Sequence, residues 1–141
     1  MPGGRRTVVP MTAPPPSPSI LVVEDDPTIA GLVGMLFRKE GYATTVLRDG
    51  RAALAHVARE APASAAILDV MLPYADGLAV TQAIRADARW AGVPVVVLSA
   101  RTAPVDQERA RLAGANEVMA KPFHPQHLLA AVRRLAGEGG A

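Results

Sequence analysis

The sequence predicts an α/β fold in which five parallel strands form a doubly wound sheet with helices on both faces. From residue 20 onward, short apolar runs alternate with helical stretches of roughly ten residues or more, which is the pattern of a (βα)5 chain. Three of the runs are apolar throughout, as expected of strands that helices cover on both sides. The 141 residues of the chain suffice for one such domain but not for two.

The strands are predicted at five places in the chain. The first, third and fourth are the continuous apolar runs at residues 20–23, 65–68 and 95–98. The second and fifth, at residues 44–47 and 117–120, are more polar. Because edge strands are less covered than central ones, we expect these two nearer the edges of the sheet.

The first and last predicted helices carry apolar residues at helical spacing, which places them on one face. In the first helix, which follows Pro27, these residues are Ile29, Leu32, Val33 and Leu36. In the last helix, which runs between Pro125 and Gly137, they are Leu128, Leu129, Val132 and Leu135. Proline is favoured in a first helical turn and glycine just beyond a helix end.

The three helices between them have shorter stripes. Leu54 with Val57 marks the second helix, and Val80 with Ile84 marks the third. The fourth, at residues 105–112, has only a thin apolar stripe among charged residues. Since helices in proteins owe most of their stability to the packing of an apolar face, we expect the fourth helix to be the most loosely held.

The two ends of the chain differ from the rest. Residues 1–18 contain six of the 13 prolines and show no apolar period, a composition typical of an extended, disordered tail. We therefore predict a disordered tail at residues 1–18, one domain at residues 19–137 and a flexible end at residues 138–141. Because the chain stops shortly after the last helix, we expect either a single-domain protein or a domain cut at a linker.

Composition and charge exclude several classes of protein. Without cysteine, the chain forms neither disulfides nor thiolate metal sites. The apolar runs are too short to cross a bilayer and no secretory signal is present, so we expect a cytoplasmic protein without membrane contact. The net charge of +2 comes from Arg5 and Arg6, since residues 20–141 hold 13 cations and 13 anions. This balance gives no support for direct nucleic-acid binding.

Polar residues follow four of the five predicted strands. They are Glu24, Asp25 and Asp26 after the first strand, Asp69 after the third, Ser99 after the fourth and Lys121 after the fifth. The second strand ends in residues 48–50, which offer no obvious partner. In open parallel sheets the functional site lies beyond the carboxyl ends of the strands. We therefore expect the polar groups to meet in one crevice, with Asp26 in a minor part.

The acids in this crevice require a cation. Two carboxylates about 5 Å apart repel by roughly 3 kcal/mol at an effective dielectric constant of about 20. With no cysteine in the chain and no histidine near these strand ends, Mg²⁺ is favoured, with Mn²⁺ as a possible substitute. The compact ammonium of Lys121 and the hydroxyl of Ser99 suit phosphate oxygens. Together these groups indicate a carboxylate that accepts a phosphoryl group beside a metal ion.

Four motifs in order carry a resemblance to a known family. They are ILVVEDDP, DVMLPYADG, VVVLSA and KPF. Asp25, Asp69, Ser99 and Lys121 within them are separated by 44, 30 and 22 residues. Over residues 19–137 the chain resembles the receiver domain of two-component response regulators, the CheY-like family. The resemblance implies a flavodoxin/CheY-like sheet with strand order 2-1-3-4-5.

The resemblance also implies a role for each site residue. Asp69 would be the phosphoacceptor, and Ser99 and Lys121 would hold phosphoryl oxygens. The metal ligands would be Glu24, Asp25, Asp69 and the backbone carbonyl of Met71. The peptide bond between Lys121 and Pro122 would be cis. Met71 and Arg101 flank the approach to the site, and we expect them to tune how fast water reaches the acyl phosphate.

The implied function is that of a signalling switch. A sensor histidine kinase or a histidine phosphotransfer protein would donate the phosphoryl group, and the receiver would catalyse its own phosphorylation and dephosphorylation. Phosphorylation would rearrange the surface of the fourth helix, fifth strand and fifth helix for a downstream protein effector.

One departure from the family pattern keeps an alternative open. Val118 stands where the family usually has an aromatic residue that moves inward. A valine side chain cannot exchange solvent exposure for burial in the same way. A pseudo-receiver that acts as a phosphorylation-independent adaptor is therefore an alternative. A haloacid-dehalogenase type phosphatase ranks below it, because that class needs an aspartate two residues after the nucleophile, where this chain has Met71.

Overall fold

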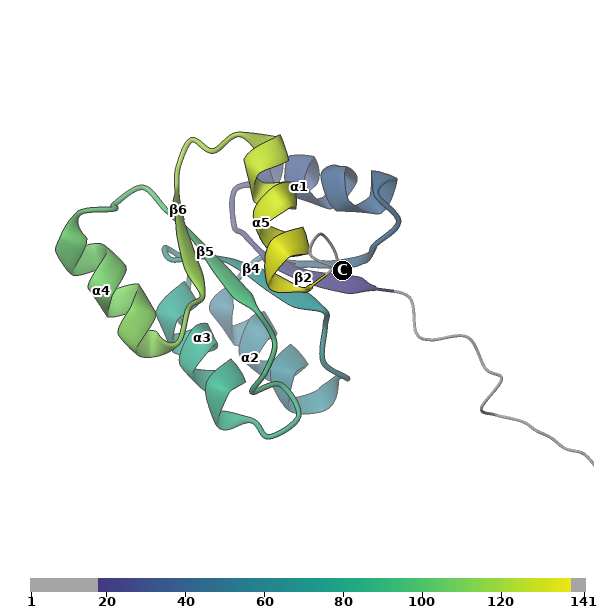
Figure 1. Cartoon of the computed structure of the whole chain (residues 1–141). Coiled ribbons are helices and arrows are strands. Elements are labelled where there is room, and N and C mark those ends of the chain that lie inside the picture. The colour runs from purple at the N-terminus through teal and green to yellow at the C-terminus, as the bar shows by residue number, and fades with distance from the viewer. Residues whose placement is uncertain (1–17, 138–141) are drawn as a thin grey trace, which may run out of the picture.

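Five helices and five parallel strands alternate along the part of the chain that the computed structural model describes, residues 18–137 (Figure 1). The strands are β2 (Ser19–Val23), β3 (Ala43–Leu47), β4 (Ala65–Asp69), β5 (Val95–Ser99) and β6 (Glu117–Ala120). The helices are α1 (Pro27–Lys39), α2 (Gly50–Arg59), α3 (Gly77–Ala86), α4 (Pro104–Ala113) and α5 (Pro125–Leu135). Residues 1–17 of the tail predicted at residues 1–18, and the end predicted at residues 138–141, lie outside the described residues.

The strands form one sheet in the order β3-β2-β4-β5-β6. Numbered along the chain, this is the order 2-1-3-4-5, so the predicted fold class is confirmed. The register pairs Val23 with both Leu47 and Leu68, and Ser99 with Ala120. The carboxyl ends of the strands are therefore nearly level, and the residues that follow them share one edge of the sheet.

Helices cover both faces of the sheet and bury two apolar clusters. On one face, α1 and α5 pack over a cluster that contains Phe37, Leu128 and Val132. On the other face, α2 and α3 pack over a cluster that contains Ile84 and Trp90. All five side chains are fully buried, and burial of each large apolar side chain contributes about 1.5–3 kcal/mol.

The core face of α1 differs from the predicted stripe. Val33 is buried and Ile29 and Leu36 pack against the core, but Leu32 is 45% exposed. The buried face instead includes Ala30, Gly34 and Phe37. The small residues Ala30 and Gly34 let α1 lie close to the sheet. A stripe defined by large apolar residues does not include them.

The fourth helix buries little, in keeping with its thin apolar stripe. Only Ala110 and Ala113 of α4 are buried, and Ala103, at the N-cap position before the helix, provides no side-chain cap. Both Val105 and Leu112 are more than half exposed. The expectation that α4 is the most loosely held helix stays a prediction.

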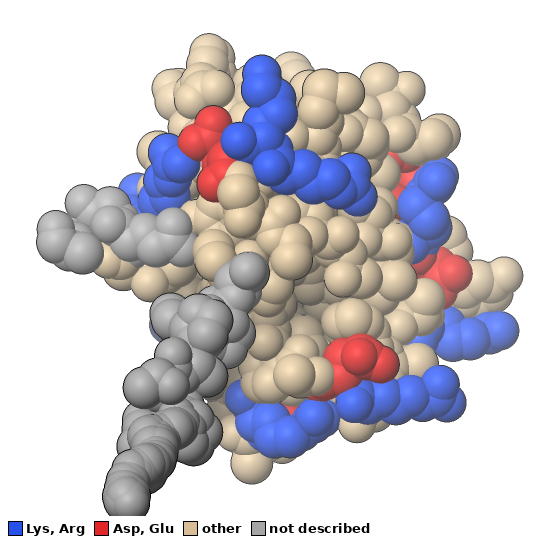
Figure 2. Space-filling model, turned by 90° about the vertical axis from the view of Figure 1, so that its right-hand side faces the viewer, with Lys and Arg blue, Asp and Glu red and all other residues tan. Residues whose placement is uncertain are grey.

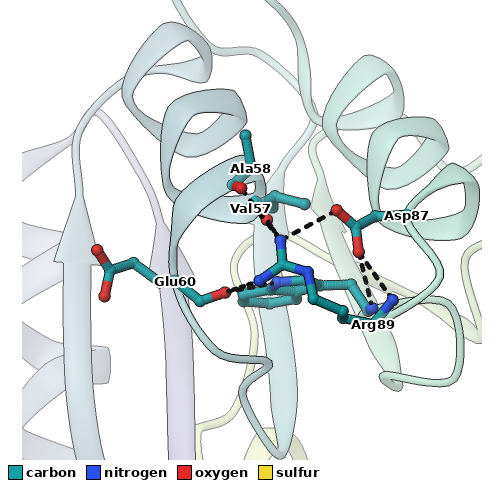
Figure 3. A network of polar contacts seen from close by, with 6 residues as sticks. Val57, Ala58, Glu60, Asp87 and Arg89 are labelled. Carbon is teal, nitrogen blue, oxygen red and sulfur yellow. Dashed lines mark hydrogen bonds and ion pairs between the residues drawn. The ribbon is translucent and has the colours of Figure 1, made fainter.

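An arginine closes the C-terminal end of α2 against the loop that precedes β5 (Figure 3). The guanidinium of Arg89 donates to the carbonyl oxygens of Val57 at 2.7 Å, Ala58 at 3.1 Å and Glu60 at 3.0 Å. It also pairs with the carboxylate of Asp87 at 3.1 Å. The last carbonyl groups of a helix have no partner inside the helix, so Arg89 supplies the missing donors.

The described residues contain no helix long and apolar enough to cross a membrane. On the face that Figure 2 shows, Lys and Arg side chains lie in separate groups with Asp and Glu among them. Charges of both signs are therefore mixed on this face.

Candidate functional site

Acidic and basic side chains from three strand ends meet at the carboxyl edge of the sheet. Glu24 follows β2, Asp69 ends β4 and Lys121 follows β6. The ammonium nitrogen of Lys121 lies 2.8 Å from Oε1 of Glu24 and 3.0 Å from Oδ2 of Asp69. Both carboxylates are almost fully buried, and the Lys121 side chain is 19% exposed. The structure therefore brings these three predicted residues together.

Asp25 completes the acidic group. Glu24, Asp25 and Asp69 each place a carboxylate oxygen within 4.8 Å of the others. Asp26 has a separate task, because its carboxylate accepts hydrogen bonds from the amides of Thr28 at 2.8 Å and Ile29 at 3.2 Å. It is therefore the N-cap of α1, in agreement with the minor part expected for it in the site.

The electrostatics of the site favour an added cation. Burial raises the pKa of Glu24 above its usual value of 4.5, the contact with Lys121 lowers it, and nearby Asp69 raises it further. Burial lowers the pKa of Lys121, but its ion pairs with Glu24 and Asp69 outweigh that effect and raise the pKa above 10.5. One ammonium thus serves two buried carboxylates.

The donor set fits a hard divalent ion. Oε1 of Glu24 is buried and accepts no hydrogen bond, since the Lys121 ammonium beside it makes an ion pair without hydrogen-bond geometry. The one ammonium beside it is shared with Asp69, so two buried carboxylates have a single cation between them and a second cation would stabilise them further. Three carboxylates that offer only oxygen suit Mg²⁺ or Mn²⁺. Glu24, Asp25 and Asp69 are thus able to hold the predicted ion.

Ser99 lies at the end of β5, with its hydroxyl turned to the next loop. The hydroxyl donates to the carbonyl oxygen of Arg101 at 2.7 Å and accepts from the amide of Arg101 at 2.9 Å. The amide of Met71 donates to Oδ1 of Asp69 at 3.2 Å. Met71 itself is 71% exposed. Ser99 and Met71 therefore flank the buried carboxylate from two loops.

The connection after β6 has the predicted backbone form. The peptide bond between Lys121 and Pro122 is cis, as expected. The amide of Lys121 donates to the carbonyl oxygen of Ser99 at 2.8 Å. This bond joins the ends of β5 and β6 directly beside the buried carboxylates.

Val118 lines an open groove next to the site. The groove has a volume of about 380 Å³ and lies between β5, α4 and the loop after β4. Val97, Leu78 and Ala110 form part of its apolar lining, and Ser99 also lines it. The short side chain at position 118 leaves this space unfilled.

The turn after β3 corrects one expectation. The sequence offers no obvious partner there, but the turn contacts both acidic loops. Arg48 donates from Nη2 to the carbonyl oxygen of Asp25 at 2.7 Å. The amide of Gly50 donates to the carbonyl oxygen of Pro73 at 3.0 Å. The sequence could not show these contacts, because backbone atoms provide the acceptor in both and the donor in one.

The sequence of this chain is similar to sequences of known proteins. The sequence model of the response regulator receiver domain matches residues 20–133. The DNA-binding response regulator MtrA of Mycolicibacterium smegmatis is 43% identical over 114 residues, which cover 81% of this chain and 48% of that protein. The sensory transduction protein RegX3 of Mycobacterium bovis is 38% identical over 122 residues, which cover 86% of this chain and 52% of that protein. The chain thus spans about half the length of the curated relatives it matches.

Solved structures agree with the fold. The receiver domain of a Pseudomonas aeruginosa sensor histidine kinase, with a magnesium ion coordinated in its active site cleft, is 33% identical with a TM-score of 0.78. That alignment covers 86% of this chain and 99% of the other. The chemotaxis response regulator CheY4 of Vibrio cholerae is 28% identical with a TM-score of 0.79, over 85% of this chain and 99% of the other.

Proposed function

The chain belongs to the response regulator receiver domain family, and on that premise we propose that Asp69 accepts a phosphoryl group from a phosphohistidine of a sensor kinase or phosphotransfer protein. The observation that carries the proposal is the burial of Asp69 between the Lys121 ammonium at 3.0 Å and the Met71 amide at 3.2 Å. Both contacts hold the carboxylate in one orientation. An oriented nucleophile lowers the entropic part of the barrier to attack.

The transfer forms a bond between a carboxylate oxygen of Asp69 and phosphorus, and it breaks the bond between phosphorus and the imidazole nitrogen of the donor. The imidazole leaves with the electron pair of that bond. Lys121 balances the negative charge that the phosphoryl group brings beside Glu24 and Asp69. Ser99 lies at the end of the neighbouring strand, and its hydroxyl would turn from the Arg101 carbonyl to a phosphoryl oxygen.

Glu24, Asp25, Asp69 and the Met71 carbonyl would hold Mg²⁺, or Mn²⁺ in its place. A bound divalent ion offsets the repulsion between the phosphoryl oxygens and the carboxylates. The magnesium ion in the cleft of the Pseudomonas aeruginosa receiver domain supports this assignment, as do the carboxylate oxygens that Glu24, Asp25 and Asp69 place within 4.8 Å of one another.

The output would be a change of surface. When the Ser99 hydroxyl leaves the Arg101 carbonyl, the loop between β5 and α4 loses one of its two bonds to Ser99. The equilibrium between two conformations of the surface formed by α4, β6 and α5 then shifts, and the favoured conformation binds a downstream protein. The curated relatives are named as DNA-binding or sensory transduction regulators. For the residues of this chain itself we propose protein partners, without direct nucleic-acid contact.

A phosphorylation-independent adaptor is the second candidate. Val118 favours it, because the groove beside this residue is not filled by an aromatic side chain. The complete set of Asp69, Ser99 and Lys121 favours the phosphorylated switch.

The test is the intact mass of the chain after incubation with phosphoramidate and Mg²⁺. Uptake of one phosphoryl group that is absent in Asp69→Asn and in the presence of EDTA is the expected result. No uptake under conditions where Mg²⁺ binding is measured separately would favour the adaptor.

A further inference from the structure

The connection between β3 and α2 touches both acidic loops of the site without carrying an acid to the metal. We call residues 47–51 the β3–α2 turn. It contacts the loop after β2, which holds Glu24 and Asp25, and the loop after β4, residues 70–76. Its residues do not belong to the four motifs of the site, and the proposed reaction assigns them no chemical role.

The contacts to the first acidic loop run through backbone acceptors. The amide of Glu24 donates to the carbonyl oxygen of Leu47 at 3.0 Å. Arg48 donates from Nη2 to the carbonyl oxygen of Asp25 at 2.7 Å. Two consecutive residues of the turn therefore fix the backbone of the two consecutive acids.

The contacts to the second acidic loop involve the next part of the turn. The amide of Gly50 donates to the carbonyl oxygen of Pro73 at 3.0 Å. The guanidinium carbon of Arg51 lies 4.1 Å from the centre of the Tyr74 ring, which is a cation–π distance. The turn thus holds the middle of the loop that begins at Asp69.

The fit at Gly50 leaves no room for a side chain. A Cβ atom on Gly50 would lie 1.7 Å from the carbonyl oxygen of Ala75 and 2.5 Å from its carbonyl carbon. These are backbone atoms, so a rotamer change cannot relieve the clash. Gly50 is therefore required for the close approach of the turn to the loop.

The loop after β4 has a strained backbone conformation. Tyr74 has a φ of 73°, a left-handed conformation that is unfavourable for residues other than glycine. The carbonyl oxygen of Pro73 accepts from Gly50 and also from the amide of Ala75 at 2.9 Å. Such a conformation persists only where the surroundings hold it, and the β3–α2 turn provides contacts on both sides of it.

From these contacts we infer that the β3–α2 turn is a positioning element, which sets the distance between the two acidic loops and so the affinity of the site for its divalent ion. Gly50 and Arg48 are its positioning residues. The inference rests on the proposed metal site, since it assigns the turn a role toward Glu24, Asp25 and Asp69. Groups that orient metal ligands from outside the ligand shell commonly change metal affinity by about 10- to 100-fold.

The test is the dissociation constant for Mn²⁺, measured from the electron paramagnetic resonance signal of the free ion. We expect Gly50→Ala to weaken Mn²⁺ binding by about 10- to 100-fold. Gly31→Ala is the matched control, because a Cβ on Gly31 in α1 meets no atom within 4 Å. Unchanged Mn²⁺ affinity in folded Gly50→Ala would overturn the inference.

A second variant decides the question if Gly50→Ala does not fold. Arg48 is exposed, so Arg48→Ala is expected to keep the fold. Loss of a cation near three carboxylates would by charge alone tighten Mn²⁺ binding, whereas loss of its hydrogen bond to Asp25 would weaken it. We expect a weakening of about two- to tenfold, with Arg59→Ala at the far end of α2 as the matched control. A tighter or unchanged dissociation constant would overturn the inference.

Two further readouts separate this inference from its premise. Amide hydrogen exchange should accelerate at residues 71–76 in Gly50→Ala but not in Gly31→Ala, and equal exchange rates in both would contradict positioning. Phosphoryl uptake by the unsubstituted chain is measured in parallel. If that chain binds Mn²⁺ but takes up no phosphoryl group, the proposed function fails while the role of the turn is still decided by the Mn²⁺ affinities.

Discussion

Lys121 and Glu24 form an ion pair with Nζ 2.8 Å from Oε1, although Glu24 is only 1% exposed and this oxygen accepts no hydrogen bond. The same ammonium lies 3.0 Å from Asp69. A single cation therefore stabilises two buried anions, and its removal should affect both stability and metal binding.

Lys121→Met should destabilise the metal-free chain, because it leaves two buried carboxylates without a partner. Breaking a buried ion pair costs about 3–5 kcal/mol, and the 19% exposure of the Lys121 side chain reduces the expected loss to about 2–3 kcal/mol. Urea unfolding with and without Mg²⁺ measures this loss, and Mg²⁺ should restore part of it. Lys39→Met, at an exposed position at the end of α1, is the control. Equal unfolding free energies in the two variants would contradict the account.

The carboxylate of Asp87 should make the acid stability of the fold pH-dependent. Its hydrogen bond to the Arg89 side chain holds the pKa of Asp87 below its usual value of 3.8. Because the folded pKa lies below the unfolded pKa, the stabilisation is present above pH 3.8 and is lost as the pH falls through the folded pKa. The urea midpoint should therefore drop more steeply in acid for the unsubstituted chain than for Asp87→Asn. If the urea midpoints of the two chains fall at the same rate as the pH is lowered, the pair of Asp87 and Arg89 contributes nothing to the pH dependence of stability.

An aromatic residue at position 118 should restore the missing part of the switch. The groove of about 380 Å³ beside Val118 has room for a ring, and burial of the added apolar surface contributes about 1 kcal/mol. Beryllofluoride serves as the phosphoryl analogue. Val118→Phe should gain more thermal stability from beryllofluoride and Mg²⁺ than the unsubstituted chain. An equal gain would mean that the groove takes no part in the switch.

Met71 and Arg101 should set the lifetime of the acyl phosphate. Met71 is 71% exposed and the Arg101 side chain is 81% exposed, so both project into solvent beside Asp69 and Ser99. Replacing both with alanine should open the path for water and speed dephosphorylation several-fold, as followed by intact mass after removal of the donor. A matched replacement of Arg38 on α1 should change nothing. The same lifetime in the double variant would remove these residues from the account.

Most of the fold could be predicted from the apolar runs, because strands buried on both faces leave a continuous signal. The convergence of Glu24, Asp69 and Lys121 could also be predicted, since parallel strands place their carboxyl ends at one edge. Leu32 belongs to the apolar stripe of the first helix yet is 45% exposed, because the buried face of α1 includes the small residues Ala30 and Gly34.

The β3–α2 turn could not be predicted from residue types. The amide of Gly50 and the carbonyl groups of Asp25 and Pro73 exist in any sequence, so their pairing depends on the folded positions of three loops. The clash that a side chain at Gly50 would cause is likewise visible only once Ala75 is in place.

The central claim is that Asp69 carries the phosphoryl group, and its most direct test locates that group in the chain. After phosphorylation with phosphoramidate and Mg²⁺, borohydride reduces an aspartyl phosphate to homoserine, which peptide mass spectrometry identifies by position. The account predicts homoserine at position 69 and at no other aspartate. Homoserine at Asp25 or Asp26, or none at position 69 in a chain that has gained a phosphoryl group, would contradict it.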